Sequence, residues 1–564
     1  LENTLLHHSP TNINLLHAAL NFLSSKMKVT SNWIALLVLS LFAIAPSFAI
    51  SGAAIVDYQQ RVYSKCAMAK YPALCVTTLM NLNHQPDDFI SALVNKSLSE
   101  SKLPTSYFHI PTSKLDTQSL VSKRSESVTD HCTELMSMSQ KRLDQALIAL
   151  KESPATSKED IQTWVSAALT FQDACKDSAD NLGLSPELTH HISDKMGYLA
   201  RLGSNVLSLV NNLLPVRSSN KKVAKNGNKE EEHSQFPGWL SIRERKLLQA
   251  TGIKANAVVA KDGSGDYATI SQAISAASGG RFVIYVKAGV YKEKIRTNKN
   301  GITLIGDGKY STIITGDDSV NGGSSMPGSA TFTVTGDGFI ARDIGFQNTA
   351  GPEGLQALAI HVSSDHSVFF RCSIAGYQDT VYALALRQFY RECDIYGTID
   401  FLFGNAAAVF QSCSIVLRKP RHGSSYNVIV AHGRSDPGQN TGFVLQRCKI
   451  AAGSDYFPLR HSVSAYLGRP WKQYSRAVVM ESSIDDSVSS RGWVEWPGAG
   501  SYSKTLYFAE YANSGPGAAT SQRVNWPGYH VIGGPEASKF TVGNFISGSS
   551  WLPSTGATFV SGLQ

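Results

Sequence analysis

Charged residues are scarce in this 564-residue chain. They make up 17% of it, against 42% apolar residues, and 45 glycines are present. This composition excludes a disordered chain and is typical of a folded protein rich in β-structure and turns. The formal net charge is only +8, and no tract or helix face gathers the basic residues, which argues against a nucleic-acid binder. The length predicts two or more domains.

Several functional motifs are also missing. The eight cysteines form no Cys-x-x-Cys pair, so we expect no structural zinc site, and we expect no metal or other cofactor. No dense carboxylate cluster is present to hold calcium. The chain contains no Gly-x-Ser-x-Gly elbow, which disfavours a serine esterase.

The N-terminal segment carries a processing signal. Met27-Lys28 precedes an apolar run over residues 33–45 and then Ser47-Phe48-Ala49, a small-x-small cleavage pattern. Because the apolar run is short for a membrane span, we expect residues 27–49 to be a secretory signal peptide. Residues 1–26 are interpreted as translated upstream sequence. An uncleaved membrane anchor is the alternative, whereas a secreted protein makes the cysteines candidates for disulfides.

Residues 50–215 are predicted to form an all-α helical bundle. Apolar residues recur at three- and four-residue spacing over 140–150, 161–182 and 185–214, and short loops between such helices favour a bundle. Two cysteine pairs fit this region. Cys66 and Cys75 are spaced to close a small loop, and Cys132 and Cys175 to join two helices.

A polar stretch over residues 216–248 is expected to be an exposed linker, because it has almost no apolar content. It ends on the basic segment Arg245-Lys246-Leu247-Leu248. From composition alone, a protease site and an ordinary charged turn are equally good interpretations of that segment.

Residues 249–564 are predicted to be all-β. Short β-branched and aromatic runs alternate with turns at residues 282–286, 302–305, 331–334 and 359–362. The pattern Cys-x-Ile recurs about every 20 residues, at Cys372, Cys393, Cys413 and, after a longer interval, Cys448. A repeat of this length favours a parallel β-helix of stacked coils over a sandwich.

Two aspartates occupy the same place in successive copies of that repeat. Asp379 lies seven residues after Cys372, and Asp400 lies seven residues after Cys393. Equivalent positions of neighbouring coils are about 4.8 Å apart, so the carboxylates are predicted to lie side by side with their pKa values split. An isolated Asp in a turn is ordinarily a turn former. Here aromatic and amide residues surround both carboxylates, which favours acid/base and nucleophilic chemistry.

Ordered motifs along residues 255–564 resemble the plant pectin methylesterases, carbohydrate esterases built on a right-handed parallel β-helix. The motifs are Gly289-Val290-Tyr291-Lys292-Glu293, Gln378-Asp379-Thr380, Gly397-Thr398-Ile399-Asp400-Phe401 and Leu467-Gly468-Arg469-Pro470-Trp471. Residues 55–213 resemble the plant invertase and pectin methylesterase inhibitor domain. That second resemblance implies a four-helix bundle with two disulfides, made by Cys66 with Cys75 and by Cys132 with Cys175, and favours maturation at residues 245–248.

The first resemblance implies the roles of individual residues. Asp400 is the nucleophile on the methyl-ester carbonyl, and Asp379 is the proton donor and acceptor. Gln356 and Gln378 stabilise the oxyanion, and Arg469 orients Asp400. The residues implied to bind the polymer are Gln356, Arg469, Trp471, Tyr382, Phe403 and Trp493.

Further expectations concern modification, location and partners. The resemblance implies a Cys393–Cys413 disulfide, whereas a small apolar residue in the coil interior is the other interpretation of these cysteines. Asn95 is the expected glycosylation site. We expect a secreted, monomeric cell-wall protein with no membrane or nucleic-acid partner. Its expected partners are methyl-esterified pectin, separate inhibitor proteins and a processing protease, and its bundle either inhibits the enzyme or assists its folding.

One segment departs from the family pattern. Where family members often carry a substrate-binding Thr-Thr-aromatic segment, this chain has Ser325-Met326-Pro327-Gly328, so that contact is not carried over. Two rival functions stay open. A retaining glycosidase also uses two carboxylates about 5 Å apart, and an inhibitory or wall-binding protein would act through the helical region alone.

Overall fold

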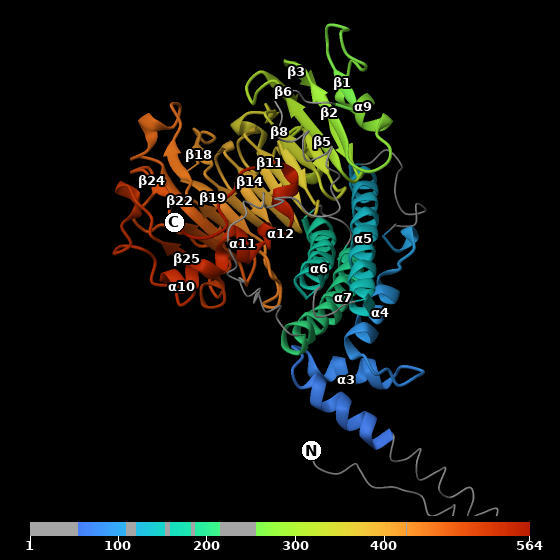
Figure 1. Ribbon diagram of the computed structural model, residues 1–564. Coiled ribbons are helices and arrows are strands. Elements are labelled where there is room, and N and C mark those ends of the chain that lie inside the picture. Colours follow the sequence, from blue (N-terminus) through green and yellow to red (C-terminus); the bar gives the residue numbers. More distant parts are fainter. Residues whose placement is uncertain (1–54, 109–119, 153–157, 182–185, 215–254, 425) are drawn as a thin grey trace, which may run out of the picture.

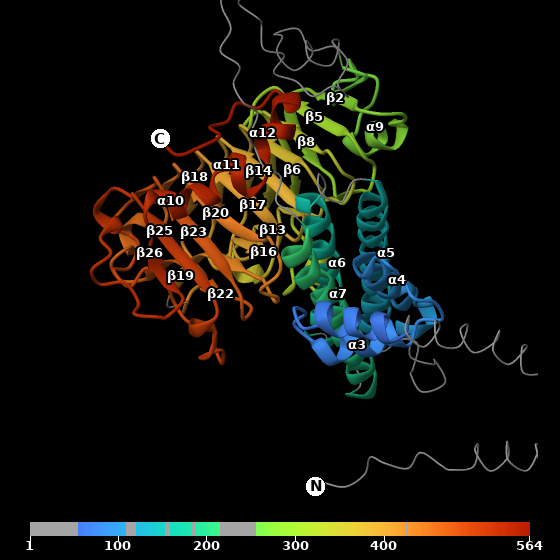
Figure 2. The same ribbon diagram turned by 60° about the horizontal axis from the view of Figure 1, so that its bottom comes forward.

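The computed structural model describes residues 55–108, 120–152, 158–181, 186–214, 255–424 and 426–564 (Figure 1). A helical part and a β part stand side by side in both ribbon views (Figures 1 and 2). The segments interpreted as upstream sequence, signal peptide, linker and basic processing site lie outside the described residues.

The helical part is a four-helix bundle, as predicted. Helix α5 packs against α6, α6 against α7, and α4 against both α5 and α7. The helices are α3 (Pro72–Met80), α4 (Phe89–Ser101), α5 (Leu120–Glu152), α6 (Lys158–Asn181) and α7 (Pro186–Leu213), and residues 55–66 are also helical. Asp88 begins α4 because its carboxylate accepts hydrogen bonds from the backbone N–H groups of Ile90 and Ser91. Pro186 begins α7, where its missing N–H costs nothing.

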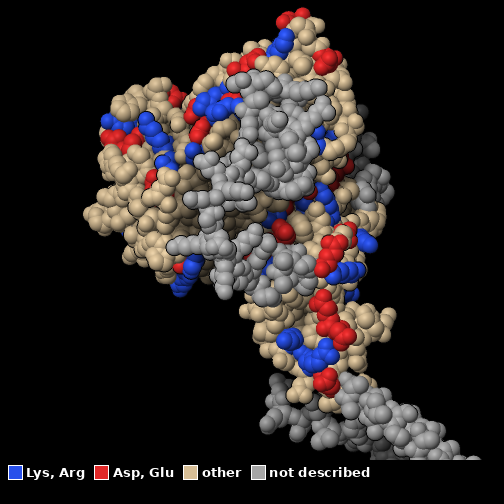
Figure 3. Space-filling view, in the orientation of Figure 1, with Lys and Arg blue, Asp and Glu red and all other residues tan. Residues whose placement is uncertain are grey.

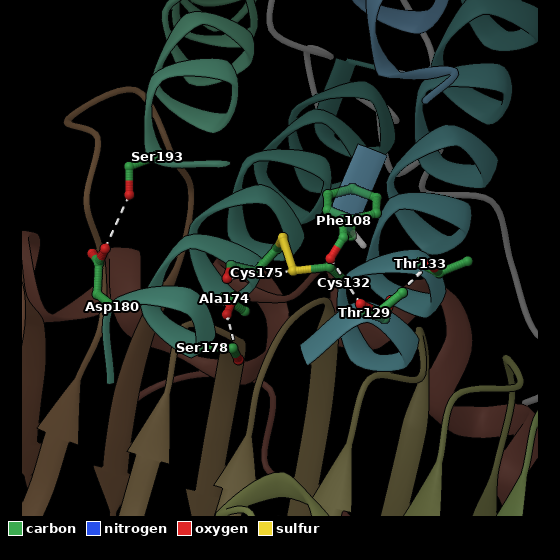
Figure 4. Close-up of a disulfide and its surroundings, with 9 residues drawn as sticks. All are labelled: Phe108, Thr129, Cys132, Thr133, Ala174, Cys175, Ser178, Asp180 and Ser193. Atoms are coloured by element: carbon green, nitrogen blue, oxygen red, sulfur yellow. Dashed lines mark hydrogen bonds between the residues drawn. A yellow bond between two sulfur atoms is a disulfide. The ribbon is translucent and has the colours of Figure 1, made fainter. Parts of the chain in front are cut away.

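Two disulfides connect parts of the bundle, and both predicted pairings are confirmed. Cys66 is bonded to Cys75 across a separation of nine residues. Cys132 of α5 is bonded to Cys175 of α6, where these helices approach the strands of the β part (Figure 4). The second bond therefore joins the two helices beside the sheet.

The β part is a parallel β-helix of three sheets, and every strand pair within the sheets is parallel. The first sheet contains β1 (Ala257–Val259), β2 (Phe282–Val286), β5 (Ile302–Gly306), β8 (Ile340–Arg342), β11 (Ser367–Phe370), β14 (Arg387–Arg391), β17 (Ala407–Gln411), β20 (Gly442–Gln446), β23 (Arg476–Met480), β25 (Tyr507–Tyr511) and β26 (Tyr529–Val531).

The other two sheets complete the coils. One contains β4 (Ile295–Thr297), β7 (Phe332–Val334), β10 (Ile360–Val362), β13 (Val381–Ala383), β16 (Leu402–Gly404), β19 (Tyr426–His432) and β22 (Ser464–Pro470). The other contains β3 (Gly289–Lys292), β6 (Thr312–Gly316), β9 (Gly345–Asn348), β12 (Ser373–Ala375), β15 (Asp394–Gly397), β18 (Ser414–Leu417), β21 (Lys449–Ala452) and β24 (Ser483–Ile484). We call the sheet from β4 to β22 the site sheet.

Side chains of successive coils stack inside the β-helix. The rings of Phe369 and Tyr390 are stacked 4.9 Å apart, and those of Tyr390 and Phe410 4.5 Å apart. The predicted Cys-x-Ile repeat is confirmed as a register, because Ser373 pairs with Asp394 and Asp394 with Ser414. A dry interior of stacked apolar side chains contributes most of the stability of such a solenoid.

The predicted Cys393–Cys413 disulfide is wrong for this structure, in which both cysteines are buried free thiols. The Cys393 thiol donates to the carbonyl of Phe369 at 3.3 Å, and the Cys413 thiol to that of Tyr390 at 3.4 Å. Register neighbours on parallel strands point the same way at about the 4.8 Å strand spacing, which is wider than the ~3.8 Å Cβ separation that a disulfide prefers. These cysteines are interior packing residues, which was the other interpretation.

Short helices cap the first coils and cover one outer face of the β-helix. Helix α9 (Ile270–Ala276) lies at the first coils, and its Ile270 and Ile274 belong to the interior core. At the C-terminus, α10 (Gly534–Ala537), α11 (Val542–Phe545) and α12 (Gly548–Trp551) cover the outer face of the first sheet. The 3-10 turns are η1 (Thr105–Phe108), η3 (Pro327–Ser329), η4 (Pro352–Gly354), η5 (Phe457–Leu459), η6 (Tyr502–Lys504), η7 (Pro516–Ala518), η8 (Ser538–Phe540) and η9 (Leu552–Thr555).

The surface carries both signs of charge. On the face shown in Figure 3, acidic and basic side chains are intermingled over the bundle and the β-helix. Among the described residues, no helix has both the length and the apolar content that a membrane crossing requires.

Candidate active site

The two aspartates precede neighbouring strands of the site sheet. Val381 pairs with Leu402 and Tyr382 with Phe403, so Asp379 and Asp400 occupy equivalent positions two residues before these strands. Both have a left-handed backbone, with φ of 62° and 52°. The register therefore confirms the predicted side-by-side placement.

The turn before Asp400 depends on a glycine. A Cβ at Gly397 would lie 2.1 Å from the Cβ of Phe401, closer than any side chain permits. The chain therefore turns tightly between these residues, and Asp400 lies within that turn.

Arg469 holds Asp400 in a two-pronged ion pair. Its Nε donates to Oδ1 of Asp400 at 2.8 Å, and its Nη2 donates to Oδ2. Two groups then hold the guanidinium: Nη1 donates to the hydroxyl of Tyr426 at 3.1 Å, and the ring of Trp496 lies 4.3 Å from Cζ. A bidentate arginine fixes both the orientation and the charge of a carboxylate.

Asp379 has no such partner, and the two carboxyls differ accordingly. Burial, and then the charge of Asp400, raise the pKa of Asp379 well above its ordinary value, although Arg469 opposes this. Burial also raises the pKa of Asp400 above its ordinary value, but by less, because Arg469 pairs with it directly and opposes the rise. The geometry therefore favours one ionised carboxylate beside one protonated carboxyl.

The two predicted amides lie next to this pair. Gln356 and Gln378 form a parallel bridge, so they also stand on neighbouring coils. Gln378 directly precedes Asp379, and both glutamine side chains are half-buried. Two side-chain amides are thereby available as hydrogen-bond donors beside the carboxylates.

Outward-facing residues of the site sheet extend from the aspartates. The rings of Tyr382 and Phe403 are stacked 4.3 Å apart and nearly parallel, and His361 is stacked on Tyr382 at 4.7 Å. Trp471 follows, with its ring centroid 6.0 Å from that of Phe403. This row, from His361 through Tyr382 and Phe403 to Trp471, is called the aromatic row below.

The bundle covers the aromatic row. One buried apolar cluster contains Tyr382 and Phe403 together with Met136 of α5, Phe171 of α6 and Met196 of α7. Figure 2 shows α6 and α7 alongside β13 and β16. Tyr382 and Phe403 are consequently buried in the full chain, at 2% and 4% exposure.

Polar contacts reinforce this interface. Asn405, next to the aromatic row, donates to Thr170 of α6 at 2.8 Å, and Gln439 donates to the carbonyl of Ser166 at 3.0 Å. The ion pairs across the interface are Arg387–Asp160, Arg142–Asp337, Lys141–Asp337, Lys70–Asp436, Arg296–Glu134 and Lys472–Asp177. The bundle is thus docked by apolar and charged contacts along α5 and α6.

The placement of Trp493 in the substrate cleft is wrong. Its side chain is fully buried in the interior core, stacked on Phe508 at 4.5 Å and donating to Glu510. The tryptophan beside the site is Trp496, three residues later, over the Arg469 guanidinium. Trp493 pairs with Gly468 as an isolated bridge of the site sheet, and this bridge points its ring into the β-helix.

Residues 325–328, which depart from the family pattern, make an apolar contact beside the site. Pro327 begins the turn η3, and Met326 packs against the cluster shared by the bundle and the aromatic row. A methionine therefore stands beside the row at this segment. Asn95, the expected glycosylation site, is exposed on α4.

Within the described ranges, no group of three or more His, Cys, Asp or Glu side chains is placed to hold a metal ion. The residues that the structure brings together are Asp379, Asp400, Gln356, Gln378, Arg469, Tyr382, Phe403 and Trp471. Such an arrangement has the groups that a carboxylate nucleophile with an acid/base partner requires.

Comparisons with known proteins cover both parts of the chain. A family model described as pectinesterase matches residues 256–549, and one described as plant invertase/pectin methylesterase inhibitor matches residues 60–209. The probable pectinesterase/pectinesterase inhibitor 54 of Arabidopsis thaliana is 49% identical, over 86% of this chain and 90% of its own length. Pectinesterase 2 of Citrus sinensis is 44% identical, over 89% of this chain and 95% of its own. The solved pectin methylesterase from carrot is 50% identical with a TM-score of 0.54, and its whole length matches 56% of this chain.

Proposed function

The chain belongs to the pectinesterase family, and on that premise we propose that it removes methyl groups from the galacturonosyl methyl esters of pectin, with Asp400 as nucleophile. The products are methanol and pectate. The observation that carries the assignment is the ion pair of Asp400 with Arg469, one coil from a carboxyl whose pKa is raised.

In the proposed reaction, a carboxylate oxygen of Asp400 attacks the ester carbonyl. The Gln356 and Gln378 amides donate hydrogen bonds to the oxyanion, each worth roughly 3 kcal/mol in the transition state. Asp379 gives its proton to departing methanol, leaving an acyl-enzyme on Asp400. Asp379 then takes a proton from water, whose attack releases the acid and restores Asp400.

The aromatic row is proposed to bind the sugar rings of the polymer. Tyr382, Phe403 and Trp471 form a continuous apolar surface beside the carboxylates, and sugar rings pack on aromatic faces of this kind. Trp496 joins them through its position over Arg469.

The bundle is proposed to inhibit the enzyme until it is removed. Its contacts bury Tyr382 and Phe403, so a polymer cannot reach the row while the bundle is docked. We further propose secretion to the cell wall after signal cleavage at about residue 49, and maturation within Arg245-Lys246-Leu247-Leu248 by a processing protease. Glycosylation at Asn95, a monomeric state and regulation by separate inhibitor proteins complete the proposal.

The test uses the released segment, residues 249–564, because the carrot structure shows that a relative of this segment folds without a bundle. Asp400→Asn is expected to lower methanol release from pectin by at least about 10³-fold, since the amide cannot act as the nucleophile. Asp486→Asn is the matched control, because that carboxylate is 44% exposed and pairs with Arg460. Full activity in Asp400→Asn would refute the nucleophile.

The same assay separates the esterase from a glycosidase. An esterase releases methanol and creates no reducing ends, whereas reducing ends without methanol would identify glycoside hydrolysis. The bundle is tested with residues 50–215 expressed alone and added to the released segment. Inhibition of methanol release is expected, and no effect would contradict autoinhibition.

A further inference from the structure

Helix α6 directs two carboxylates at the β-helix. Asp173 and Asp177 are four residues apart and therefore lie on one face of the helix, roughly 6 Å apart along its axis. Asp177 accepts a hydrogen bond from the Lys472 ammonium, with 2.5 Å between Oδ1 and Nζ, and Asp173 accepts one from the Ser435 hydroxyl. Lys472 and Ser435 both belong to the β-helix part of the chain.

Lys472 and Ser435 stand at one end of the aromatic row. Lys472 directly follows Trp471, and its Nζ lies 5.6 Å from the Trp471 ring. Ser435 lies two residues after Gly433, where an added Cβ would be 2.8 Å from the Trp471 ring. Lys472 therefore borders Trp471, and Ser435 belongs to the segment that packs against the Trp471 ring.

Asp177 also lies near the aromatic row, because its charge acts on Tyr382. Burial raises the pKa of the Tyr382 phenol, and the charges of Asp177 and Asp379 raise it further. Tyr382 is therefore close to a carboxylate of the bundle and to one of the active site. Asp177 thus lies beside Lys472 at the Trp471 end of the aromatic row.

We propose that Lys472 and Ser435 form a subsite for the free carboxylate of a galacturonosyl unit that has already lost its methyl group, and that Asp177 and Asp173 occupy this subsite in the full chain. The inference rests on the proposed function, because only a pectin-bound enzyme would meet such a unit. The bundle thereby presents carboxylates where the polymer presents its own.

The chemistry of the subsite separates free from esterified units. In the full chain the Lys472 side chain is 27% exposed, and Asp177 outweighs the effect of burial, which would lower the pKa of Lys472, so the ammonium is charged where it meets a carboxylate. A carboxylate forms a charge-assisted hydrogen bond with such an ammonium, whereas a methyl ester offers only a neutral acceptor. Pectin with a free unit at this position therefore binds more tightly than fully esterified pectin.

The experiment compares the released segment with its Lys472→Met variant, which keeps most of the apolar stem and loses the charge. The probes are a fully demethylated oligogalacturonate, whose dissociation constant is measured by calorimetry, and two pectins, nearly fully and about half esterified, whose KM is measured by methanol release. Loss of the ion pair is expected to weaken oligogalacturonate binding about tenfold and to raise KM for the half-esterified pectin similarly. The change on the nearly fully esterified pectin is expected to be several-fold smaller.

A second variant and a control keep the test specific. Ser435→Ala is expected to weaken oligogalacturonate binding about threefold, because it removes one neutral hydrogen bond. Lys449→Met, an exposed lysine on β21, controls for loss of a positive charge elsewhere on the β-helix and is expected to leave both readouts unchanged.

The outcomes distinguish the two proposals. Absence of methanol release by the parent segment would overturn the proposed function. Normal methanol release with oligogalacturonate binding unchanged in Lys472→Met would overturn the subsite and leave Lys472 as a docking residue for the bundle only. Equal losses on both pectins would also overturn it, because the subsite is defined by its preference for a free carboxylate.

Discussion

At the scale of single residues, a difference in partners separates two chemically identical side chains. Asp400 accepts two hydrogen bonds from the Arg469 guanidinium. Asp379 lies beside Asp400 but takes no part in that ion pair. The repeat in the chain places both carboxyls, but the arginine comes from β22, 69 residues after Asp400. The asymmetry that the proposed mechanism needs therefore comes from a long-range contact.

Arg469→Met is expected to move the acid limb of the pH–rate profile. Arg469 favours the ionised form of Asp400, so its removal raises the pKa of Asp400, and the nucleophile becomes ionised only at higher pH. In the released segment, the acid limb of the pH–rate profile should shift to higher pH by about 1–2 units. The maximal rate should fall about 10²-fold, because the carboxylate is also less well oriented.

Methanol release measured from about pH 4 to pH 9 checks this. Tyr426→Phe is the graded comparison, since it removes one hydrogen bond to Arg469 and should shift the limb by a smaller amount. An Arg469→Met profile that loses rate without moving its acid limb would show that the arginine has no electrostatic role.

Residue positions were predictable from the chain as far as the repeat extends. The period of the Cys-x-Ile pattern predicts the register, and hence that Asp379 and Asp400 are neighbours. Side-chain direction outside the repeat was not predictable. A shift of three residues in an irregular segment separates the interior Trp493 from Trp496 at the site, and no local pattern encodes that turn.

At the scale of elements, helix α6 carries the contact between the two parts. It contributes Phe171 to the apolar cluster, Thr170 and Ser166 to hydrogen bonds, and Asp173 and Asp177 to the end of the aromatic row. The three long helices were recognisable from apolar spacing. The early turns of α5 were not, since the predicted segment begins at residue 140 and the helix begins at Leu120.

Asp173 is expected to make docking of the bundle depend on pH. Burial raises the pKa of Asp173 to about 6 from its ordinary 3.8, so the docked form holds a proton that the undocked form has lost between these values. The contribution of Asp173 to the free energy of docking is therefore fully present below about pH 4 and is lost as pH rises through about 6. The docking free energy becomes weaker by about 3 kcal/mol over this range.

The check compares the parent with Asp173→Asn, each cut within the linker, by the dissociation constant of the two fragments at about pH 4 and pH 7. Docking of the asparagine variant should not weaken through this group as pH rises. The difference between the two proteins therefore measures the contribution of Asp173. His131 has the opposite slope, because burial, and then Arg296, lower its pKa to about 4. A constant ratio of parent to variant dissociation constants across pH would contradict the prediction.

At the scale of the whole molecule, the bundle and the β-helix are docked to each other. No local sequence pattern predicts their interface. Its ion pairs join residues far apart in the chain, such as Arg142 with Asp337, 195 residues later. Each part was predictable in fold from its own periodicity. Their docking depends on complementary shape and charge between two folded surfaces, which no local sequence pattern predicts.

Cutting the linker is expected to leave the fragments bound and inactive at micromolar concentration, because the interface keeps its apolar cluster and ion pairs. Arg142→Met should raise the dissociation constant of the two fragments about 10²-fold. The Arg142 side chain is 1% exposed and makes two hydrogen bonds to Asp337, which the variant leaves paired with Lys141 alone.

Gel filtration and methanol release of the cut protein, followed on dilution, measure this. Arg61→Met, which loses an exposed pair within the bundle, should behave as the parent. Co-elution of the Arg142→Met fragments down to the same dilution as the parent would show that this pair contributes nothing to docking.

Synthesis runs from the bundle to the β-helix. The last bundle helix ends at Leu213, whereas the first strand of the β-helix begins at Ala257, and Arg469 lies more than 200 residues further on. Because domains fold as units while the chain grows from its N-terminus, the bundle is complete before the ribosome adds the second half of the site. The cleft therefore forms against a bundle that has already folded, so a newly made chain is covered as soon as its site is complete.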